Sequence, residues 1–390
     1  MTRPDDACRP DYAGGGIVNL MASLVQARGG TARAPEARLL PARELGDIPQ
    51  IVLLVIDGLG ADWLDRHAPR GLLSQHRLGT LTSVFPTATA PAITTFLTGV
   101  APGQHGVTGW FVWLRELGCV LKILSGQPRY GGADYRQARL NVRALCPQPA
   151  LFDDLAVPAA VVSPREIARS PFNLAHLGRD TRLYPCAGFG DLCRQIERAL
   201  RAVPAPGYVY AYWPKLDALG HRHGIASPAA VAHLRDIERH LDTLRKRVAG
   251  RGVALLVSAD HGQIDTAPAA TVELAAHPRL AATLRLPLCG EPRAAFCYPG
   301  LAQAEAFVAY CDAQLAAAVT VWRGADAIAQ RLFGPGPVHP ELSHRIGDFV
   351  LTGRGAWIVR DRLPTEEPFV QIGVHGGLSR AEMLVPLCRL

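Results

Sequence analysis

The stretch that decides the fold is Ile51-Val-Leu-Leu-Val-Ile56, which runs directly into Asp57-Gly58. A continuous apolar run that ends at a turn is typical of a strand buried on both faces, as in a parallel sheet. Outward from it, further candidate strands occupy 80–85, 119–124, 159–163, 207–212 and 253–258. Helical patterns separate most of these strands, which predicts an α/β protein built from strand–helix–strand units.

The clearest helix begins at Ser227-Pro228, an N-cap followed by proline at the first helical position, and Gly250 ends it. Its apolar residues recur at three- and four-residue intervals: Val231, Leu234, Ile237, Leu241, Leu244 and Val248. Because this helix leads into the strand 253–258, the pattern predicts the right-handed crossovers of a doubly wound sheet.

The composition and the pattern of expected elements divide the chain into three parts. Residues 1–49, with one helical stretch at 17–26, are expected to form an N-terminal extension packed on the core. Residues 50–265 and 371–390 are expected to form the core, and 266–370 a smaller inserted α+β lobe. In this lobe, expected helices (304–318, 325–333) alternate with expected strands (293–298, 319–323, 348–352).

The composition is that of a globular protein, 48% hydrophobic and 19% charged, with a formal net charge of +7. The charge is compatible with an anionic substrate, although an Ala/Arg/Pro/Gly-rich composition explains it as well. No Lys/Arg run of the nucleic-acid-binding type occurs, so a nucleic-acid polymer is not an expected partner.

Nine scattered cysteines without a CxxC pair predict free thiols in a reducing compartment. Neither a secretory signal nor an apolar run of about 18 residues is visible, so no membrane partner is expected. We therefore expect a cytoplasmic protein. Its oligomeric state does not follow from the sequence.

Residues that can bind metals stand at the ends of the candidate strands, where open α/β sheets bind their ligands. A single Asp or His in such a place is usually a turn or cap residue, but several together, each near a glycine, favour a common site. Three aspartates and three histidines suit Zn²⁺, Mn²⁺ or Fe better than Mg²⁺ or Ca²⁺. They are Asp57, Asp217, His221, Asp260, His261 and His375.

The segment Phe85-Pro-Thr-Ala-Thr-Ala-Pro-Ala-Ile-Thr94 holds a candidate nucleophile. Pro91 can open a helix, which places Thr89 at its N-terminus, where the helix dipole favours an alkoxide and an anionic phosphate. Metal coordination could activate this hydroxyl. From the residues alone, Thr89 could equally be a helix cap, and Thr87 and Thr94 remain alternatives.

Together these residues resemble the alkaline phosphatase superfamily, and within it the nucleotide pyrophosphatase/phosphodiesterase-type branch. The motifs that carry the resemblance span 51 to 390, apart from 266–370. In order they are VIDGLG, FPTATAPAITTFLTG, QHGVTGW, YWPKLDALGHRHG, SADHG and HGGLSRAEMLVPL. The resemblance implies an alkaline-phosphatase-like fold, a mostly parallel doubly wound sheet flanked by helices.

The resemblance also implies two divalent metal ions, with zinc favoured over manganese or iron. Asp217, His221 and His375 would bind one ion. Asp57, Asp260 and His261 would bind the other, with the Thr89 oxygen as an additional ligand. Thr89 would attack phosphorus and form a phospho-threonine intermediate, and a threonine at this place argues against a sulfatase. The expected partner is a small anionic phosphate ester.

The sequence departs from the branch at one place. An asparagine expected soon after the nucleophile helix, which would bind a phosphate oxygen, is replaced by Trp110. Thr108 or an arginine could replace this donor. Preference for mono- or diesters would depend on what contacts the second ester group, and the candidates for that contact are Arg115, Arg129, Arg136, Arg139 and Arg165. Trp110, Trp113 and Tyr130 could stack on a substrate, but core packing is the favoured interpretation. His105 is interpreted as structural.

The favoured function is therefore a phosphodiesterase or nucleotide pyrophosphatase. A phosphonate C–P hydrolase or a phosphomonoesterase could use the same metal core, because this fold supports several chemistries. A catalytically idle, metal-bound interaction module is the alternative of another class. Retention of all six ligand positions and Thr89 argues against it.

Overall fold

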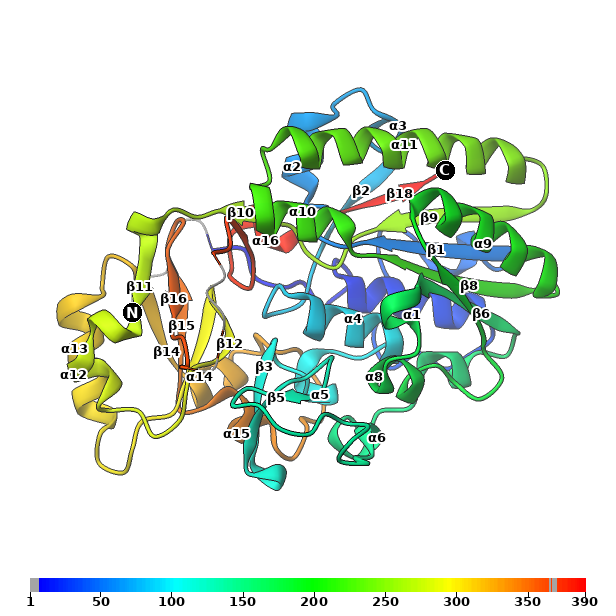
Figure 1. The fold of residues 1–390 in the computed structure, drawn as a ribbon. Helices are drawn as coiled ribbons and strands as arrows, with labels where there is room; N and C mark the ends of the chain where they lie inside the picture. Colours follow the sequence, from blue (N-terminus) through cyan, green and yellow to red (C-terminus); the bar gives the residue numbers. More distant parts are fainter. Residues whose placement is uncertain (1–6, 365, 367–369) are drawn as a thin grey trace.

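Two seven-stranded sheets organise the computed structural model, which describes residues 7–364, 366 and 370–390 (Figure 1). The strands of the central sheet, in spatial order, are Arg77–Thr82 (β2), Leu384–Arg389 (β18), Val253–Ser258 (β9), Gln50–Ile56 (β1), Gly207–Trp213 (β8), Ala159–Pro164 (β6) and Arg182–Cys186 (β7). The run Ile51–Ile56 is fully buried in β1, which pairs in parallel with β8 and β9. Because strands flank β1 on both sides and helices cover its faces, an uninterrupted apolar run is stable there.

The predicted α/β fold with a mainly parallel central sheet is confirmed. Five predicted strands are present in it, one of them at 77–82 rather than 80–85. The C-terminal strand β18 was not predicted. It lies antiparallel between β2 and β9 and so brings the end of the chain into the sheet.

Helices cover both faces of this sheet. In Figure 1, α9 and α11 lie on one face, and α1 and α4 lie on the other. The predicted amphipathic helix is confirmed as α11: the Ser227 hydroxyl accepts a hydrogen bond from the Ala230 N–H, and the predicted apolar face is largely buried. The helices of the larger lobe, which is built around the central sheet, are Ile17–Ala27 (α1), Ala61–His67 (α2), Leu72–Gln75 (α3), Thr89–Thr98 (α4), Pro102–His105 (α5), Val142–Leu145 (α6), Arg165–Ala168 (α7), Pro171–Ala175 (α8), Phe189–Ala202 (α9), Lys215–His223 (α10), Pro228–Val248 (α11) and Arg380–Met383 (α16).

A second, antiparallel sheet forms the smaller lobe. Its strands, in spatial order, are Val319–Arg323 (β14), Phe349–Gly353 (β15), Ala294–Cys297 (β13), Cys289–Glu291 (β12), Phe111–Leu114 (β3), Cys119–Lys122 (β4) and Gln127–Pro128 (β5). The helices of this lobe are Pro278–Ala281 (α12), Ala304–Gln314 (α13), Gly324–Ala329 (α14) and Leu342–Ile346 (α15). Two short strand pairs complete the structure: Ile264–Asp265 (β10) with Gly373–Val374 (β17), and Thr271–Glu273 (β11) with Ile358–Arg360 (β16).

The second sheet extends beyond the predicted insert at 266–370. Strands β3, β4 and β5 come from 111–128, and Phe111 pairs with Gly290 across β3 and β12. The strand expected at 119–124 is therefore β4 of this sheet and not part of the parallel series, which corrects the sequence-based expectation. A short apolar run indicates a strand but does not reveal its partner, because pairing depends on distant segments.

The N-terminal segment contributes to the main core. Ile17, Leu20, Met21 and Leu24 of α1 are at most 1% exposed and belong to the same apolar cluster as β1. The eight cysteines from Cys119 to Cys388 carry free thiols, as their spacing predicts. Within the described part of the chain, no helix combines the length and apolarity needed to cross a bilayer.

Candidate metal centre and active site

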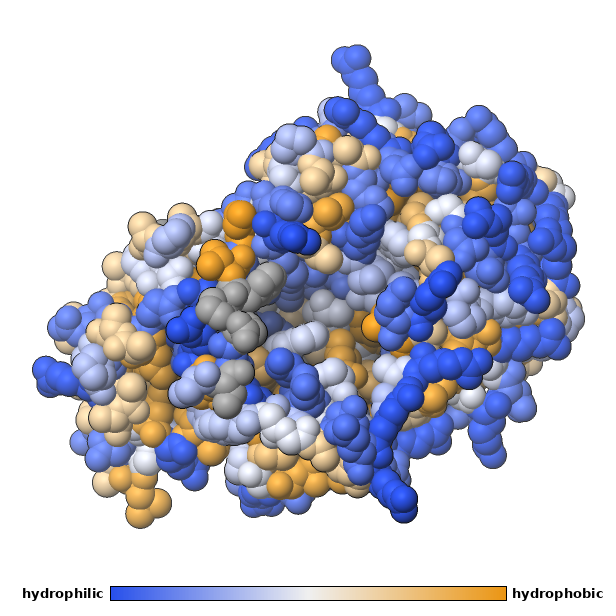
Figure 2. Space-filling model, in the orientation of Figure 1, coloured by the Kyte–Doolittle hydropathy of each residue, from blue (hydrophilic) through white to orange (hydrophobic). Residues whose placement is uncertain are grey.

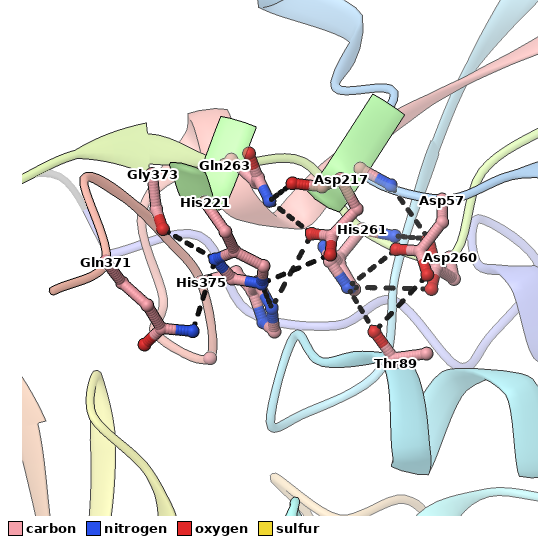
Figure 3. A network of polar contacts seen from close by, with 12 residues as sticks. Asp57, Thr89, Asp217, His221, Asp260, His261, Gln263, Gln371, Gly373 and His375 are labelled. Atoms are coloured by element: carbon pink, nitrogen blue, oxygen red, sulfur yellow. Dashed lines mark hydrogen bonds and ion pairs between the residues drawn. The ribbon is translucent and has the colours of Figure 1, made fainter. Parts of the chain in front are cut away.

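The first group of predicted ligands lies at the carboxyl ends of β1 and β9, two neighbouring strands. Asp57 follows β1, and Asp260 and His261 follow β9, so their side chains converge (Figure 3). The His261 Nε2 atom is 3.3 Å from Asp57 Oδ1 and 3.5 Å from Asp260 Oδ2. We refer to Asp57, Asp260 and His261 as group one; all three are at most 2% exposed.

The second group comes from α10 and from the loop after β17. Asp217 and His221 stand one turn apart on α10, and His221 Nε2 is 3.1 Å from Asp217 Oδ2. His375 Nε2 is 3.3 Å from His221 Nε2 and 3.7 Å from Asp217 Oδ1. We refer to Asp217, His221 and His375 as group two. The six predicted metal ligands thus lie together, in the two groups of three that the resemblance implies.

The two groups adjoin each other through His261. Its ring stacks on the His375 ring with 3.9 Å between the centroids. Ligand atoms of Asp217, His261 and His375 also lie within 4.8 Å of one another, as do those of Asp57, Asp260 and His261. His261 therefore faces both groups, which the one-ion assignment from the sequence did not anticipate.

Gly58 permits the end of β1 to approach α10 closely. Its φ of +76° lies in the left-handed region, and a Cβ there would sit 3.0 Å from the Cα and Cβ atoms of Asp217. A side chain at position 58 would push the end of β1 away from α10. The glycine after the first aspartate is thus required by geometry.

Backbone carbonyls orient the three imidazole rings in the same sense. The Nδ1 atoms of His221, His261 and His375 lie 2.7, 3.0 and 3.1 Å from the carbonyl oxygens of Gly373, Gly262 and Thr87. With Nδ1–H donating to these oxygens, each ring is held with its Nε2 atom toward the carboxylates. Histidines that bind metals usually show this bond from the other ring nitrogen to a backbone carbonyl.

The carboxylates of the site are crowded in a buried space. Burial raises the pKa of Asp57 well above its usual value, and the charges of Asp260 and Asp217 raise it further. Burial likewise raises the pKa of Asp260. Asp57 Oδ1 and Asp260 Oδ2 are buried without a hydrogen-bond donor and face the lone pair of His261. Such a set of mutually repelling ligand atoms fits divalent cations, which would offset the negative charge.

In group two, the charges of neighbouring side chains outweigh the effect of burial on the pKa values. Burial alone would raise the pKa of Asp217, but His221 and His375 outweigh it and hold this pKa below its usual value. Burial alone would lower the pKa of His221, but Asp217 raises it to about 9. A metal ion bound by His221 must therefore displace a proton, so metal affinity at group two should increase with pH.

Thr89 is the first residue of α4 and lies beside group one. Its Oγ1 atom is 3.2 Å from His261 Nε2 and 3.5 Å from Asp57 Oδ2. The alternative that Thr89 only caps the helix is wrong, because Ala88 is the N-cap and no side-chain capping bond forms. The Thr87 hydroxyl donates to the Gly377 carbonyl, and the Thr94 hydroxyl to the Ala90 carbonyl. Neither alternative hydroxyl contacts the two groups in this way.

Two side chains that sequence reasoning missed support the carboxylates. The Tyr212 hydroxyl donates to Asp57, and the Gln263 amide donates to Asp217. Tyr208, Tyr210 and Tyr212 alternate along β8, so the period of a strand was a signal that they share one face. Gln263 follows His261 by two residues, which was the only signal for it.

A cavity of about 520 Å³ opens beside Thr89 and Asp57, and Figure 2 shows the surface hollowed between the two lobes. Trp110 lines this cavity and is 39% exposed, so the core-packing expectation is wrong for it. It is also wrong for Tyr130, which is 56% exposed, whereas Trp113 packs against the second lobe. Thr108 is fully buried, with its hydroxyl 3.5 Å from the Arg345 carbonyl, and does not line the cavity.

Of the five arginines considered as contacts to the second ester group, only Arg136 lines the cavity. Arg129 is buried and bonds Asp361 and Glu366, and Arg115 pairs with Glu341 on the surface. His105 is buried and bonds the Thr95 hydroxyl and the Val107 N–H, in agreement with a structural role.

Three solved structures illustrate the proteins that share this fold. Murine ectonucleotide pyrophosphatase/phosphodiesterase 5 aligns with a TM-score of 0.63 and 18% identity, over 86% of this chain and 87% of that chain. Its inactive threonine-to-alanine variant in complex with AMP aligns with a TM-score of 0.64 and 17% identity, over 87% of both chains. Phosphonoacetate hydrolase from Sinorhizobium meliloti 1021, in complex with phosphonoformate, aligns with a TM-score of 0.60 and 18% identity, over 88% of this chain and 90% of that chain. No curated protein matches by sequence.

Two adjoining buried Asp/His groups, one at the ends of β1 and β9 and one from α10 and the loop after β17, form the candidate metal centre of a phosphoric ester hydrolase. A model of the type I phosphodiesterase / nucleotide pyrophosphatase family matches residues 51–144 and 155–377. The chain belongs to this family.

Proposed function

We propose that this chain cleaves phosphodiester or pyrophosphate bonds through a covalent phospho-threonine at Thr89. The observation that carries the proposal is the position of the Thr89 hydroxyl, 3.2 Å from His261 Nε2 at the start of α4 and beside both ligand groups. The family assignment supports it. The inactive threonine-to-alanine variant of the murine enzyme supports the choice of a threonine.

The donor set fits two divalent ions, with zinc favoured by its mixture of imidazole and carboxylate ligands. Group two would hold one ion, and group one would hold the other together with the Thr89 oxygen. When bound, the ions supply positive charge to the attacking and leaving oxygens of an in-line displacement.

The protein's own groups define two displacement steps. The positive end of α4 favours deprotonation of the Thr89 hydroxyl. Its oxygen attacks phosphorus, a new P–O bond forms, and the bond to the ester oxygen breaks as the alcohol or phosphate product departs. Water then attacks the phospho-threonine, the bond to Thr89 Oγ1 breaks, and a proton returns to the threonine.

A second candidate is hydrolysis of a phosphonate C–P bond. The fold similarity to phosphonoacetate hydrolase is nearly the same as that to the murine phosphodiesterase. Trp110 lines the cavity where the resemblance implies an asparagine, so the phosphodiesterase-type donor to a non-bridging phosphate oxygen is missing at this position. A panel of p-nitrophenyl phosphate, bis-p-nitrophenyl phosphate, p-nitrophenyl-TMP, a phosphonate and a sulfate ester, with Zn²⁺ and Mn²⁺, separates these functions. We expect the diesters to turn over fastest.

Thr89→Val is the substitution that tests the nucleophile. It keeps the shape of the side chain but removes the attacking oxygen, so turnover should fall by about 10³-fold or more. Acid-quenched wild-type enzyme should carry one phosphoryl-type adduct on the peptide that contains Thr89, measured by mass spectrometry.

Thr98→Val is the matched control, because the Thr98 hydroxyl donates only within α4, to the Thr94 carbonyl at 2.7 Å. It should keep both turnover and adduct. The nucleophile assignment would be overturned if Thr89→Val bound two metal ions and retained wild-type turnover. Absence of turnover on every ester and phosphonate by the metal-loaded wild type would instead favour the idle-module alternative.

A further inference from the structure

A second hollow of about 550 Å³ adjoins the cavity beside Thr89. Three arginines contribute to its wall, Arg136, Arg139 and Arg169, and most of the other residues that line it are apolar. Arg136 and Pro171 also line the cavity beside Thr89, so the two spaces meet at these residues. We refer to this second space as the arginine hollow. Its position next to the candidate active site raises the question of what it binds.

The fold brings the three arginines together from two segments. Arg136 and Arg139 share the turn before α6, where the Arg139 N–H donates to the Arg136 carbonyl at 3.2 Å. Arg169 directly follows α7, and its carbonyl accepts a hydrogen bond from the Arg136 guanidinium group. All three residues are exposed, and Figure 2 shows hydrophilic side chains gathered over α6 and α8, beside the hollowed surface between the lobes. Three positive charges therefore converge on one hollow.

These charges are not neutralised within the part of the chain that the structure describes. None of the three guanidinium groups forms an ion pair there with a carboxylate. Asp134 is close in sequence, but its Oδ1 atom accepts the backbone N–H groups of Arg136 and Gln137, at 2.8 and 2.9 Å. Other exposed arginines of this protein also lack a carboxylate partner. What distinguishes Arg136, Arg139 and Arg169 is that they line the same space.

The wall of the arginine hollow offers hydrogen-bond donors and hardly any side-chain acceptor. Guanidinium groups only donate. The remaining polar side chain of the wall is Tyr135, whose hydroxyl already donates to the Ile123 carbonyl at 2.8 Å. A matching ligand must therefore supply acceptors and negative charge. A phosphate group does both, with a charge of about −1.5 to −2 at pH 7 and three acceptor oxygens that fit the fork of an arginine.

The cavity beside Thr89 differs from the arginine hollow in its charges. Besides the carboxylates of the metal centre, it is lined by Glu166, which does not line the hollow. Ser163 and Asn173 of the cavity wall carry no charge. Between the metal centre and the hollow, Glu166 thus opposes an anion, whereas three arginines attract one within the hollow. Two separate anionic groups of one ligand would fit this distribution of charge.

We propose that the arginine hollow binds a second phosphate group of the substrate. The reacting phosphorus lies beside Thr89, and the remainder of the ester carries another phosphate at a separate position. Arg139 and Arg169 hold this second phosphate in the hollow, and Arg136 holds it from the shared wall. The preferred substrates are then phosphate esters that are phosphorylated twice. The proposal rests on the proposed function, because it assumes that the reacting phosphorus lies at Thr89.

The test compares how two matched series of compounds bind to the zinc-loaded protein, measured by calorimetry. Alkane-α,ω-bisphosphonates from propane to decane carry a phosphonate at both ends, and alkylphosphonates of equal length carry one. Once the chain is long enough to reach the hollow, the bisphosphonate should bind about tenfold tighter at low salt, because its second group gains charge-assisted hydrogen bonds. This advantage should shrink as sodium chloride is added, since exposed charges are screened.

The double variant Arg139→Gln/Arg169→Gln removes two charges from the hollow and keeps Arg136, which also lines the cavity beside Thr89. It should lose the advantage of the bisphosphonates while its affinity for methylphosphonate is unchanged. The matched control is Arg165→Gln/Arg179→Gln, which removes the same charge from two exposed arginines that line neither space. This control should keep the advantage. Chelation of zinc by the ligands is the same for each protein, so the comparison isolates the hollow.

A variant with reversed charge tests the same contact from the other side. Arg139→Glu/Arg169→Glu should bind an ω-aminoalkylphosphonate more tightly than the bisphosphonate of equal length, whereas the wild type should show the opposite order. The same order in both proteins would overturn the electrostatic role of the two arginines.

Free phosphate is the other source of the same anion, and it needs its own measurement. Wild-type protein saturated with methylphosphonate is titrated with inorganic phosphate. If phosphate binds to it while bisphosphonates show no advantage at any length, the hollow is a site for free phosphate and the assignment to the substrate is overturned.

Equal affinity for both series at every length, without binding of free phosphate, would overturn the site itself. An equal loss of the advantage in the control variant would reduce the effect to general attraction of anions and overturn it as well. Failure of the proposed function has a separate signature, because the advantage of bisphosphonates would then persist in a protein that turns over no ester. If only the second phosphate site fails, Thr89→Val still abolishes turnover while both series bind alike.

Discussion

Gly58 shows how much of the site depends on one missing side chain. Gly58 and Gly250 have nearly the same backbone, with φ of +76° and +72°. A Cβ at position 58 would meet Asp217 at 3.0 Å, whereas nothing lies within 4 Å of a Cβ at position 250. The two positions therefore share the same conformational strain and differ in the space around them.

Gly250→Ala should lower the free energy of unfolding by about 1–2 kcal/mol, the cost of placing an alanine in the left-handed region. Gly58→Ala should lower it by more, and should weaken zinc binding at least about tenfold because α10 must shift. Urea denaturation and a zinc titration measure the two effects. Equal zinc affinity in both variants would show that the contact between Gly58 and α10 does not position Asp217.

At the scale of elements, a buried ion pair ties the second lobe to the C-terminal segment. Arg293, between β12 and β13, makes two charge-assisted bonds to Glu382 of α16, at 3.1 and 2.8 Å, and both side chains are at most 1% exposed. Glu382 also accepts from the Gly377 N–H and the Ser379 hydroxyl. This ion pair precedes β18 and stands near the loop that carries His375.

Glu382→Gln should destabilise the fold by about 3–5 kcal/mol, because it leaves the Arg293 charge buried without its partner. Arg380→Gln is the control, because its pair with Asp62 spans 3.7 Å and the two side chains are 59% and 38% exposed. That variant should lose no more than about 1 kcal/mol. Similar losses in both variants, measured by urea denaturation, would mean that burial does not decide the strength of the Arg293–Glu382 pair.

The same ion pair makes the free energy of unfolding depend on pH. Burial alone would raise the pKa of Glu382, but Arg293 outweighs it and holds this pKa below its usual value of 4.5. A carboxyl with a lowered folded-state pKa stabilises the fold above its unfolded pKa, and this contribution disappears as the pH falls through the folded value. The stability difference between wild type and Glu382→Gln should therefore be constant above about pH 5 and shrink below pH 4.5. A difference that grows on acidification would contradict this linkage.

At the scale of the whole molecule, segments far apart in the sequence meet at one buried cluster of charge. Three carboxylates, of Asp57, Asp217 and Asp260, are each at most 8% exposed and come from the ends of β1, β9 and the start of α10. Their mutual repulsion opposes folding, and divalent cations that bind only the folded chain would offset it.

Chelation with EDTA should lower the melting temperature, and added Zn²⁺ or Mn²⁺ should restore it. A ligand present at about a thousand times its Kd stabilises the folded chain by about 4 kcal/mol. In EDTA, the Asp260→Asn variant should be at least as stable as the wild type, because one repelling charge is gone. Added zinc should stabilise this variant less than it stabilises the wild type. Differential scanning calorimetry measures both effects. The same zinc-induced shift in both proteins would exclude Asp260 as a ligand.

Much of the fold and the set of candidate site residues were predictable from the sequence, for a local reason. The run at 51–56 is apolar without interruption, which is typical of a strand covered on both faces, and the alternation of strands and helices predicted the parallel architecture. The metal-ligand candidates follow strand ends or stand on a helix just beyond one, and parallel strands bring those ends to one edge. Thr89 stands at the start of a helix that Pro91 helps to mark. Each of these signals lies within a few neighbouring residues.

The remaining features depend on which distant segments meet, and no local pattern contains that information. Only the tertiary structure pairs β3 with β12, inserts β18 between β2 and β9, and stacks His261 on His375 so that one imidazole faces both groups. It also removes Thr108 from the cavity and leaves Tyr210 Oη and His176 Nε2 buried without hydrogen-bond partners. Hydrophobic periodicity shows which residues are buried, whereas packing between distant segments decides which groups each buried side chain faces.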